Sequence, residues 1–477
     1  MIEGLPDAGV PADEVLAELR RLRTADLPTH GGRLFAYVYD PAVAGLDELA
    51  HAAYGISAHV NGLDPTAFPS LLAMENALVG AAAKLLGGGP ATVGTATSGG
   101  TESLILAVKA ARDARPDLAT PRLVVPSTAH AAFAKAAHYL RVALDVVPVG
   151  PDLRADAAAT AAAIGPDTVL VAASAPSYAH GVVDPVPAIA AAAAERGVRC
   201  HVDACIGGWV LPYLRRLGAD LPPFDLSVPG VTSISVDLHK YAYAPKGVSI
   251  LLHRDERLRR PQYFAYAGWP GYTMVNPGVA STRSGGPIAA ALAVLRHIGD
   301  AGYLDLAATT RDAVATLAAA VDKTDGIRLF APPETTVVCL ASDGVDLFVL
   351  ADELAARGWH TQPQMAYADL PATVHLTVTA AVGSTAGQFG PALADAVAAA
   401  RARGPVQLPP SLREAAAALT PEMVTPELIE GLAGGLGLGD GGAGPMAAVN
   451  TLLDAAPPAL REALLTGFLS LLQRPAR

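Results

Sequence analysis

The 477-residue sequence predicts an α/β protein with a mostly parallel sheet that helices cover on both faces. Between residues 70 and 255, short apolar runs rich in β-branched residues alternate with longer runs rich in Ala and Leu. The expected strands are 93–95, 122–126, 143–149, 168–173, 198–204, 232–236 and 247–253. The expected helices are 71–86, 102–112, 131–140 and 186–195. This alternation is typical of parallel strands that are joined through helices.

Changes in composition divide the chain into four parts. Residues 1–69 are expected to form an N-terminal arm, residues 70–300 a large domain and residues 301–404 a smaller α+β domain. Residues 405–477 form a tail that contains a Gly-rich linker and ends in an amphipathic helix. Outside the main alternation, the expected helices are 13–23, 286–298, 307–321 and 346–357, and the expected strands are 335–340 and 373–378. The linker is 431–445, and the apolar face of the last helix carries Leu460, Leu464, Leu465, Phe468, Leu471 and Leu472.

Composition and charge exclude several classes of protein. Apolar residues make up 51% of the chain and charged residues 17%, so the chain can fill a large core. Asp and Glu number 45 against 34 Lys and Arg, and a net charge of −11 argues against nucleic acid as a partner, because phosphate binding needs a basic face. No apolar run approaches the roughly 18 residues of a membrane span, and the N-terminus lacks the pattern of a secretory signal. Three cysteines fit a reducing compartment, so we expect a cytoplasmic enzyme.

Two motifs in the sequence are chance matches. A literal G-x-G-x-x-G at Gly437, Gly439 and Gly442 has no strand before it and no βαβ unit after it, so it does not predict a dinucleotide site. The segment 200–205, Cys-His-Val-Asp-Ala-Cys, places its His and Asp on one strand face and its first Cys on the other. A second group of ligands at zinc-like spacing is missing as well. We therefore expect no metal.

Residues 97–103, Thr-Ser-Gly-Gly-Thr-Glu-Ser, follow an expected strand and open a helix. Gly99 and Gly100 allow backbone N–H groups to approach an anion, and the helix N-terminus adds positive potential. A helix cap with Glu102 in the first turn is the alternative interpretation of the same residues. The segment is not a P-loop, because no Gly-Lys-Ser/Thr follows at the required spacing.

A lysine follows the expected strand 232–236, in the segment Ser-Val-Asp-Leu-His-Lys-Tyr at 235–241. Lys240 should therefore lie at the carboxyl edge of the sheet, where open α/β sheets bind ligands. Partial burial beside a second cation, Lys246, would lower the pKa of its amine and make it nucleophilic. The alternative is that both lysines are ordinary solvated loop residues.

Together, these features match the requirements of pyridoxal phosphate. The glycine-rich loop would bind the phosphate, Asp203 at the end of a strand would pair with the ring nitrogen, and Lys240 would react with the aldehyde. His130 heads a helix at the same sheet edge and could stack on the ring. Its alternative is a packed or capping histidine.

The sequence resembles pyridoxal-phosphate enzymes of the aspartate-aminotransferase fold (fold type I). Within the group II decarboxylase grouping it is most similar to the sphingosine-1-phosphate lyase family. The resemblance covers roughly residues 31–290 and extends weakly to 403. The segments that carry it are 32–33, Tyr39, 61–65, 68–69, Glu75, 97–103, 129–130, 135–136, 174–176, 181–184, 201–208, 237–241, 245–247 and 282–286.

The resemblance implies a transferase fold with a seven-stranded, mostly parallel sheet, pyridoxal 5′-phosphate as cofactor, and a homodimer with shared active sites. It implies that Lys240 binds the cofactor covalently, that Asp203 pairs with the pyridinium nitrogen and that His130 stacks on the ring. Tyr39 matches a family tyrosine that assists catalysis, and Tyr178 is a weaker catalytic candidate. The implied phosphate contacts are Gly100, Thr101, His239 and Lys246 from the same chain, and Ser281 and Thr282 from the other subunit.

One position departs from the family pattern. The family segment Asn-Pro-Leu-His-Pro reads Asn-Gly-Leu-Asp-Pro at 61–65, so a carboxylate, Asp64, replaces a histidine suited to a substrate phosphate. A carboxylate repels a dianion, which favours a smaller, unphosphorylated amine or amino acid.

The predicted function is that of a carbon–carbon lyase which cleaves an amino-alcohol-type substrate by retro-aldol chemistry. The alternative is a group II amino-acid decarboxylase, because the cofactor is shared and the pocket decides which bond is oriented for cleavage. An aminotransferase is less favoured, since no arginine is evident that would hold a second carboxylate. A non-catalytic scaffold is also less favoured, because it would not need to keep Lys240, Asp203 and His130.

Overall fold

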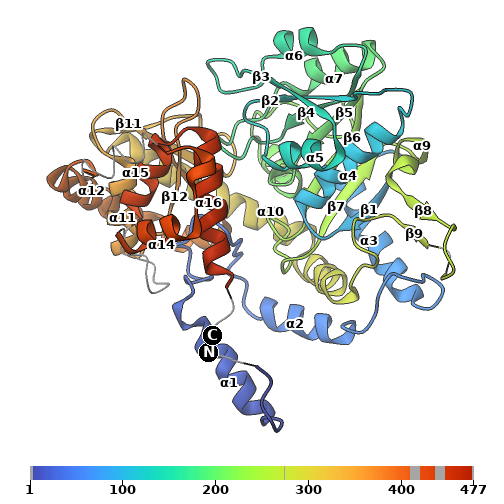
Figure 1. Cartoon of the computed structure of the whole chain (residues 1–477), viewed down its shortest axis with the longest axis horizontal. Helices are drawn as coiled ribbons and strands as arrows, with labels where there is room; N and C mark the ends of the chain where they lie inside the picture. Colours follow the sequence, from blue (N-terminus) through green and yellow to red (C-terminus); the bar gives the residue numbers. More distant parts are fainter. Residues whose placement is uncertain (1–3, 273, 409–418, 436–445, 475–477) are drawn as a thin grey trace.

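The computed structural model describes residues 4–272, 274–408, 419–435 and 446–474. Its centre is a seven-stranded sheet in the order β1-β7-β6-β5-β4-β2-β3 (Figure 1). Strand β7 runs antiparallel to its neighbours β1 and β6, and the other neighbouring pairs are parallel. The strands are β1 (Val93–Thr97), β2 (Arg122–Pro126), β3 (Ala143–Val147), β4 (Thr168–Ser174), β5 (Arg199–Asp203), β6 (Val231–Asp237) and β7 (Ser249–His253). The predicted mostly parallel sheet is confirmed.

Helices cover both faces of this sheet because its central strands are apolar on both faces. In β4, Leu170 and Ala172 pack in the cluster beneath α4 and α5, whereas Val171 and Ala173 pack in the larger cluster on the opposite face. That opposite face is covered by α3, α6, α7 and α8. The bounds are α3 (Pro69–Leu85), α4 (Gly100–Asp113), α5 (Ala132–Leu140), α6 (Ala157–Ala163), α7 (Val186–Glu195), α8 (Leu211–Arg216) and α9 (Glu256–Arg259).

A long helix, α10 (Gly285–Asp322), connects the large sheet to a smaller unit. The sequence predicted two helices, 286–298 and 307–321, and the structure joins them with a single break at Gly299. Its φ of 65° lies in the left-handed region that favours glycine. Val294 contributes to the core of the large sheet and Leu317 to the core of the smaller unit, so one helix takes part in both.

The smaller unit is built on a four-stranded antiparallel sheet in the order β10-β11-β13-β12. Its core includes Phe35 from the N-terminal segment, which stacks on Trp359 and meets the edge of Phe389. Phe35 therefore joins the N-terminal segment to this core, whereas Leu46 and Ala50 of the same segment belong to the core of the large sheet. The elements are β10 (Ile327–Leu329), β11 (Val337–Ser342), β12 (Gln362–Gln364), β13 (Thr373–Thr377), α11 (Leu347–Ala356) and α12 (Ala386–Arg403).

Three further elements lie at the periphery. The predicted N-terminal helix is confirmed as α1 (Ala12–Leu22), which buries none of its residues within the described part of the chain. Helix α2 (Leu46–Ile56) packs on α10. The strands β8 (Phe264–Tyr266) and β9 (Met274–Asn276) form a two-stranded hairpin. Across the described residues, no helix is both long and apolar enough to cross a membrane.

The tail packs beside the smaller unit (Figure 1) as α14 (Pro426–Gly435), α15 (Ala447–Ala455) and α16 (Pro458–Leu472). Helix α16 confirms the predicted amphipathic helix, and Leu460 and Leu464 are buried. Leu465 and Leu472, which were predicted on the same apolar face, are about half exposed in this chain. Each follows a packed residue by one position, which turns its side chain by about 100° around the helix.

Residues 436–445 of the expected Gly-rich linker lie outside the described residues. Residues 431–435 belong to the end of α14, because this stretch also carries Leu432 and Ala433, which pack in the tail. The literal G-x-G-x-x-G motif lies outside the described residues.

Candidate active site

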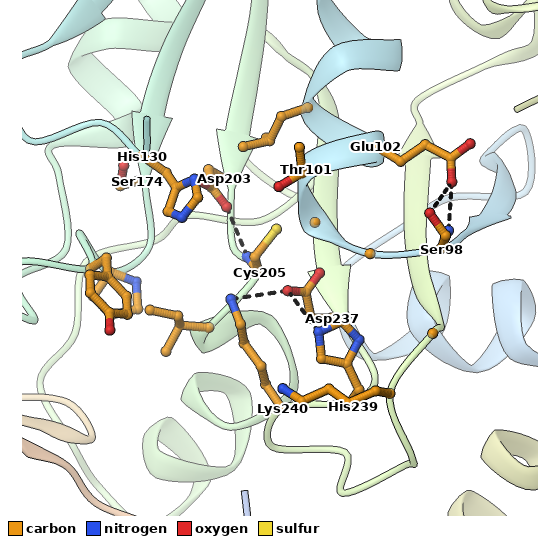
Figure 2. Close-up of a pocket in the computed structure, with 18 residues that line it drawn as sticks. Ser98, Thr101, Glu102, His130, Ser174, Asp203, Cys205, Asp237, His239 and Lys240 are labelled. Atoms are coloured by element: carbon orange, nitrogen blue, oxygen red, sulfur yellow. Dashed lines mark hydrogen bonds and ion pairs between the residues drawn. The ribbon is translucent and has the colours of Figure 1, made fainter. Parts of the chain in front are cut away.

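A cavity of about 410 Å³ opens at the carboxyl ends of β4, β5 and β6, against the start of α4 (Figure 2). Parallel strands present their carboxyl ends at one edge, so the side chains that follow them converge there. The cavity is lined by predicted residues from five separate segments of the chain. These are Gly100, Thr101, His130, Tyr178, Asp203, His239, Lys240 and Lys246.

The start of α4 combines the two interpretations of residues 97–103. Glu102 turns back and accepts hydrogen bonds from the backbone N–H and the hydroxyl of Ser98, at 2.6 and 2.7 Å. No described side chain caps the helix at its N-cap residue, Gly99, so the first backbone N–H groups stay available to an anion. Glu102 therefore stabilises the loop and leaves the anion-binding end of the helix open.

Lys240 points into the cavity, with its Nζ 3.0 Å from Oδ2 of Asp237. Burial lowers the pKa of the amine, but attraction by Asp237, with smaller contributions from other groups around the cavity, outweighs burial and raises that pKa overall. The expected lowering of the Lys240 pKa is therefore wrong. The pKa of Lys246 is lowered instead, by burial and by repulsion from Lys240.

Asp203 ends β5, and its buried carboxylate reaches the cavity and accepts a hydrogen bond from the backbone N–H of Cys205 at 3.0 Å. His201, two residues earlier, lies within hydrogen-bonding distance of the hydroxyls of Ser233 and Ser235, at 2.8 and 3.2 Å. These two contacts make His201 a satisfied core histidine. The described residues contain no group of three or more His, Cys, Asp or Glu side chains that could hold a metal ion.

His130 fits both of its interpretations at once. Its Nδ1 accepts a hydrogen bond from the backbone N–H of Ala132 at 3.2 Å, which fixes the ring at the start of α5. The same ring lines the cavity and meets Tyr178 edge-on, at 6.3 Å between centroids. In Figure 2, His130, Asp203 and Lys240 all point into one cavity.

Two tyrosines interact electrostatically with Lys240, and of these Tyr178 lines the cavity whereas Tyr39 is not among its lining residues. Burial raises the pKa of Tyr39 to about 12 despite the nearby charge of Lys240, and the Nζ of Lys246 lies 5.7 Å from the centre of the Tyr39 ring. Tyr178 donates a hydrogen bond from its hydroxyl to Gln362 and stacks on His375 at 4.6 Å between ring centroids. Burial also raises the pKa of Tyr178.

His239 is held between the backbone and a carboxylate. Its Nδ1 lies 3.0 Å from the carbonyl oxygen of Val248, and its Nε2 lies 3.6 Å from Oδ2 of Asp237. Burial lowers the pKa of His239, and the two lysines lower it further, against the attraction of Asp237.

Ser281 and Thr282 lie outside the cavity of their own chain. Ser281 is exposed, and the hydroxyl of Thr282 is 3.4 Å from Oδ1 of Asn61. The preceding loop approaches α4, because the backbone N–H of Val279 donates to Glu102 at 2.7 Å. A role of Ser281 and Thr282 at a partner's site stays a prediction.

Three polar or ionisable cavity residues received no role from the sequence: Asp237, Cys205 and Ser174. Asp237 is buried and ion-paired, and Cys205 donates from Sγ to the hydroxyl of Ser235 at 3.3 Å. Asp237 precedes Lys240 by three residues, a spacing that brings two side chains together in a turn. That spacing was a usable signal for Asp237, whereas Cys205 and Ser174 had none beyond their places after strands.

The residues present fit pyridoxal phosphate. The start of α4 packs so closely on the cavity wall that residue 100 has no room for a side chain. A Cβ added at Gly100 would lie 2.8 Å from Sγ of Cys205 and 2.9 Å from both carboxylate oxygens of Asp237. An amine, a carboxylate and an uncapped helix N-terminus are the three groups that the cofactor's aldehyde, ring nitrogen and phosphate require.

Comparison with known proteins agrees with this fit. Residues 83–376 match the aminotransferase class-V family. A sphingosine-1-phosphate lyase from Dictyostelium discoideum is 36% identical over 386 residues, which cover 79% of this chain and 70% of that protein. The chain belongs to the sphingosine-1-phosphate lyase family. The predicted resemblance is confirmed, and so is pyridoxal phosphate as the cofactor of this family.

Other members of the sphingosine-1-phosphate lyase family and its neighbours support the same placement. The structure of a sphingosine-1-phosphate lyase from Burkholderia pseudomallei has a TM-score of 0.80 at 35% identity and covers 84% of this chain and 94% of that one, which confirms the transferase fold. Sphingosine-1-phosphate lyase 1 of Rattus norvegicus is 36% identical over 79% of this chain, and the match spans 66% of the rat protein, slightly less than two thirds. A probable L-aspartate decarboxylase of Pyrococcus furiosus is 30% identical over 76% of this chain and 95% of that protein.

The tail matches a second family. Residues 410–471 correspond to "Pyridoxal-dependent enzyme, C-terminal putative HTH domain". The match includes α14, α15 and nearly all of α16. The sequence had predicted only a linker and one helix there.

Proposed function

We propose that this chain is a pyridoxal-phosphate-dependent carbon–carbon lyase that cleaves an amino-alcohol-type substrate by retro-aldol chemistry. The observation that carries the proposal is the convergence of Lys240, Asp203 and the start of α4 on one cavity. Membership of the sphingosine-1-phosphate lyase family supports the lyase over the other reactions of this cofactor.

Each side of the cavity has a separate task in this proposal. When bound, pyridoxal phosphate supplies an aldehyde for covalent attachment and a ring that withdraws electrons. Lys240 would present its amine to the aldehyde, and the carboxylate of Asp203 would keep a proton on the ring nitrogen. His130 would pack against the ring. Gly100, Thr101, His239 and Lys246 would hold the phosphate.

Proton transfer at the substrate falls to the tyrosines. With a pKa of about 12, Tyr39 keeps its phenolic proton at neutral pH, so it is suited to donate a proton rather than to accept one. Its electrostatic interaction with Lys240 supports a place for this donor close to the reacting amine. Tyr178 is the second candidate, held in place by its hydrogen bond to Gln362.

The proposed assembly is a cytoplasmic homodimer in which the partner subunit's Ser281 and the partner subunit's Thr282 complete the phosphate site. Their position outside the cavity of their own chain supports this arrangement. Nucleic acid is not a proposed partner, because residues 405–477 carry four basic and seven acidic residues.

The proposed substrate is an unphosphorylated amine. Asp64 is exposed and therefore ionised at neutral pH, and hydrogen bonds from Thr66 lower its pKa further. A negative charge at the family's phosphate-binding position disfavours a dianionic substrate.

Amino-acid decarboxylation is the second candidate reaction, and the Pyrococcus furiosus relative favours it. Purified enzyme is tested against long-chain amino alcohols, their phosphates and free amino acids, and both aldehyde and CO₂ are measured. Release of aldehyde supports the lyase, whereas release of CO₂ without aldehyde supports the decarboxylase.

Substitution of Lys240 tests the cofactor site. Purified wild-type protein should absorb near about 420 nm, and Lys240→Ala should lose this band and essentially all turnover, because the covalent link requires the amine. Asp203→Ala should lose most of the turnover. The exposed Lys323 provides the control, since Lys323→Ala should retain both signals. Wild-type rates in Lys240→Ala would contradict the proposal.

A further inference from the structure

Asp237 is a buried carboxylate at the end of β6, directly beneath the loop that opens α4. Its Oδ2 lies 3.0 Å from Nζ of Lys240, and its Oδ1 accepts a hydrogen bond from the hydroxyl of Ser249 at 2.6 Å. Gly100 covers the carboxylate from the other side with no room for a Cβ atom. Three segments of the chain therefore fix the position of this one side chain.

A buried carboxylate is costly unless a cation pairs with it. Among the described residues, two groups that can carry a positive charge lie within 4 Å of Asp237: the ammonium of Lys240 at 3.0 Å, and the imidazole of His239 at 3.6 Å, which is charged only when protonated. Burial alone would raise the pKa of Asp237, but Lys240, His239 and the bond from Ser249 together lower it, so the carboxylate stays ionised. The pair is thus an ammonium ion held by a carboxylate.

We propose that Asp237 is a positioning residue that holds the amine of Lys240 at the cavity as an ammonium ion and thereby sets the pH at which Lys240 reacts. The inference rests on the proposed role of Lys240 in cofactor attachment. Only the neutral amine is nucleophilic. Because Asp237 stabilises the ammonium form, Lys240 needs a higher pH to lose its proton and react.

Other ionisable groups face Lys240 from every element around it, but Asp237 is the carboxylate in contact with the amine. Removing its charge would leave a buried ammonium ion next to Lys246, which favours the neutral amine. The remaining groups are Tyr39 from the N-terminal segment, Tyr178 after β4, Asp203 and Cys205 after β5, and His239 and Lys246 after β6.

Competitive labelling with trace acetic anhydride measures the reactivity of each lysine as a function of pH. The protein is freed of cofactor, labelled between pH 6 and 11, digested and quantified by mass spectrometry. In wild type, Lys240 should reach half-maximal reactivity at a higher pH than the exposed Lys323. In Asp237→Asn, the acetylation rate of Lys240 at pH 8 should rise at least about tenfold, the change produced by one pKa unit, with Lys323 unchanged.

Asp203→Asn is the matched control, since it removes another carboxylate of the same cavity that is not ion-paired with Lys240. It should change the Lys240 rate less than threefold. Equal rates in wild type and Asp237→Asn, or equal effects of the two variants, would overturn the proposal. If Asp237→Asn does not fold, the wild-type pH profile alone decides. The proposal is overturned if Lys240 reaches half-maximal reactivity at a lower pH than Lys323.

The labelling result is independent of the proposed lyase function. An absorption band near about 420 nm that survives in Lys240→Ala would defeat the assignment of Lys240 as the cofactor lysine, but the labelling would still report on its contact with Asp237. A band that depends on Lys240, together with labelling that does not depend on Asp237, would defeat only the inference about Asp237.

Discussion

Gly100 lies where the start of α4 meets Cys205 and Asp237. A Cβ at this position would come within 3 Å of the sulfur of Cys205 and of both carboxylate oxygens of Asp237, closer than non-bonded atoms approach. Glycine is therefore required here by space. Because Asp237 holds Lys240, a side chain at position 100 would disturb the anion loop and the lysine together.

Gly100→Ala should lower the free energy of unfolding by about 1–3 kcal/mol, the usual cost of overpacking, and should weaken cofactor binding. Urea unfolding and cofactor titration measure the two effects. Gly80→Ala is the control, because Gly80 lies in α3 with no atom near its added Cβ, and it should gain about 0.5–1 kcal/mol. Unchanged stability and binding in Gly100→Ala would contradict the close packing.

The sequence predicted single site residues well where the chemistry itself restricts the residue type. Lys240 and Asp203 were predicted because an amine and a carboxylate after neighbouring strands match one cofactor, and both line the cavity. The pKa of Lys240 was predicted wrongly. Its direction depends on the 3.0 Å contact with Asp237, and sequence spacing does not report distances.

Helix α16 shows how the tail is held together at the scale of one element. Leu464 is buried against Ile429 and Leu460, whereas Leu469 on the opposite side is 53% exposed. Arg461 near the start of α16 donates hydrogen bonds to the carbonyl oxygens of Leu453 and Asp454 at the end of α15. These bonds link the two helices. The tail is thus a helical unit with its own small core.

Leu464→Ala should destabilise the tail by about 2–5 kcal/mol, because a buried leucine leaves a cavity. Leu469→Ala on the same helix should change stability by less than about 0.5 kcal/mol. Hydrogen exchange of residues 447–472, measured by mass spectrometry, should be faster in the first variant and unchanged in the second. Equal exchange in both variants would show that α16 does not pack through Leu464.

Element boundaries were predictable where an apolar pattern ends at a charged or turn-forming residue. The bounds of β2 and α7 agree with the prediction at both ends. Helix α6 was missed, because its run of alanines carries no apolar stripe, and α12 was missed although it packs Phe389 and Leu393 in the smaller core. Such helices are stabilised by long-range packing more than by local pattern.

At the scale of the whole molecule, buried histidines link stability to pH. His201, His253 and His375 are buried, and burial lowers their pKa values to about 3, about 4 and about 4 from an ordinary 6.5. The unfolded chain binds protons below pH 6.5, whereas the folded protein does not until a much lower pH. The contribution of these histidines to the free energy of unfolding is therefore fully present above pH 6.5 and is lost as the pH falls below it.

The free energy of unfolding should fall between pH 7 and pH 5 by about 1–2 kcal/mol for each of these histidines. Asp184 acts in the opposite direction, because burial raises its pKa to about 6 and the folded protein takes up that proton first. Three histidines outweigh one carboxyl group. Urea unfolding at both pH values measures the net loss, which should be smaller in His201→Asn. Equal stability at pH 5 and pH 7 would contradict the burial of these rings.

The proposed dimer has a test of its own. Lys240→Ala and the double variant Ser281→Ala/Thr282→Ala should each be inactive or strongly impaired. If sites are shared, mixed dimers contain one complete site, and unfolding and refolding the two variants together should restore about a quarter of wild-type activity. Sites built from a single chain would show no recovery.

The sequence by itself determined the alternation of strands and helices between residues 70 and 255 and the chemistry at the strand ends. Both depend on local information: apolar periodicity reflects which faces are buried, and each reactive group follows a strand directly. Tertiary structure alone decided that β7 lies antiparallel between β1 and β6, and that Phe35 joins the core of the smaller unit. It also decided that Asp237 pairs with Lys240 and that Ser281 and Thr282 lie outside their own cavity. These features depend on packing between segments that are far apart in the chain. A local sequence pattern carries no information on the energy of such contacts.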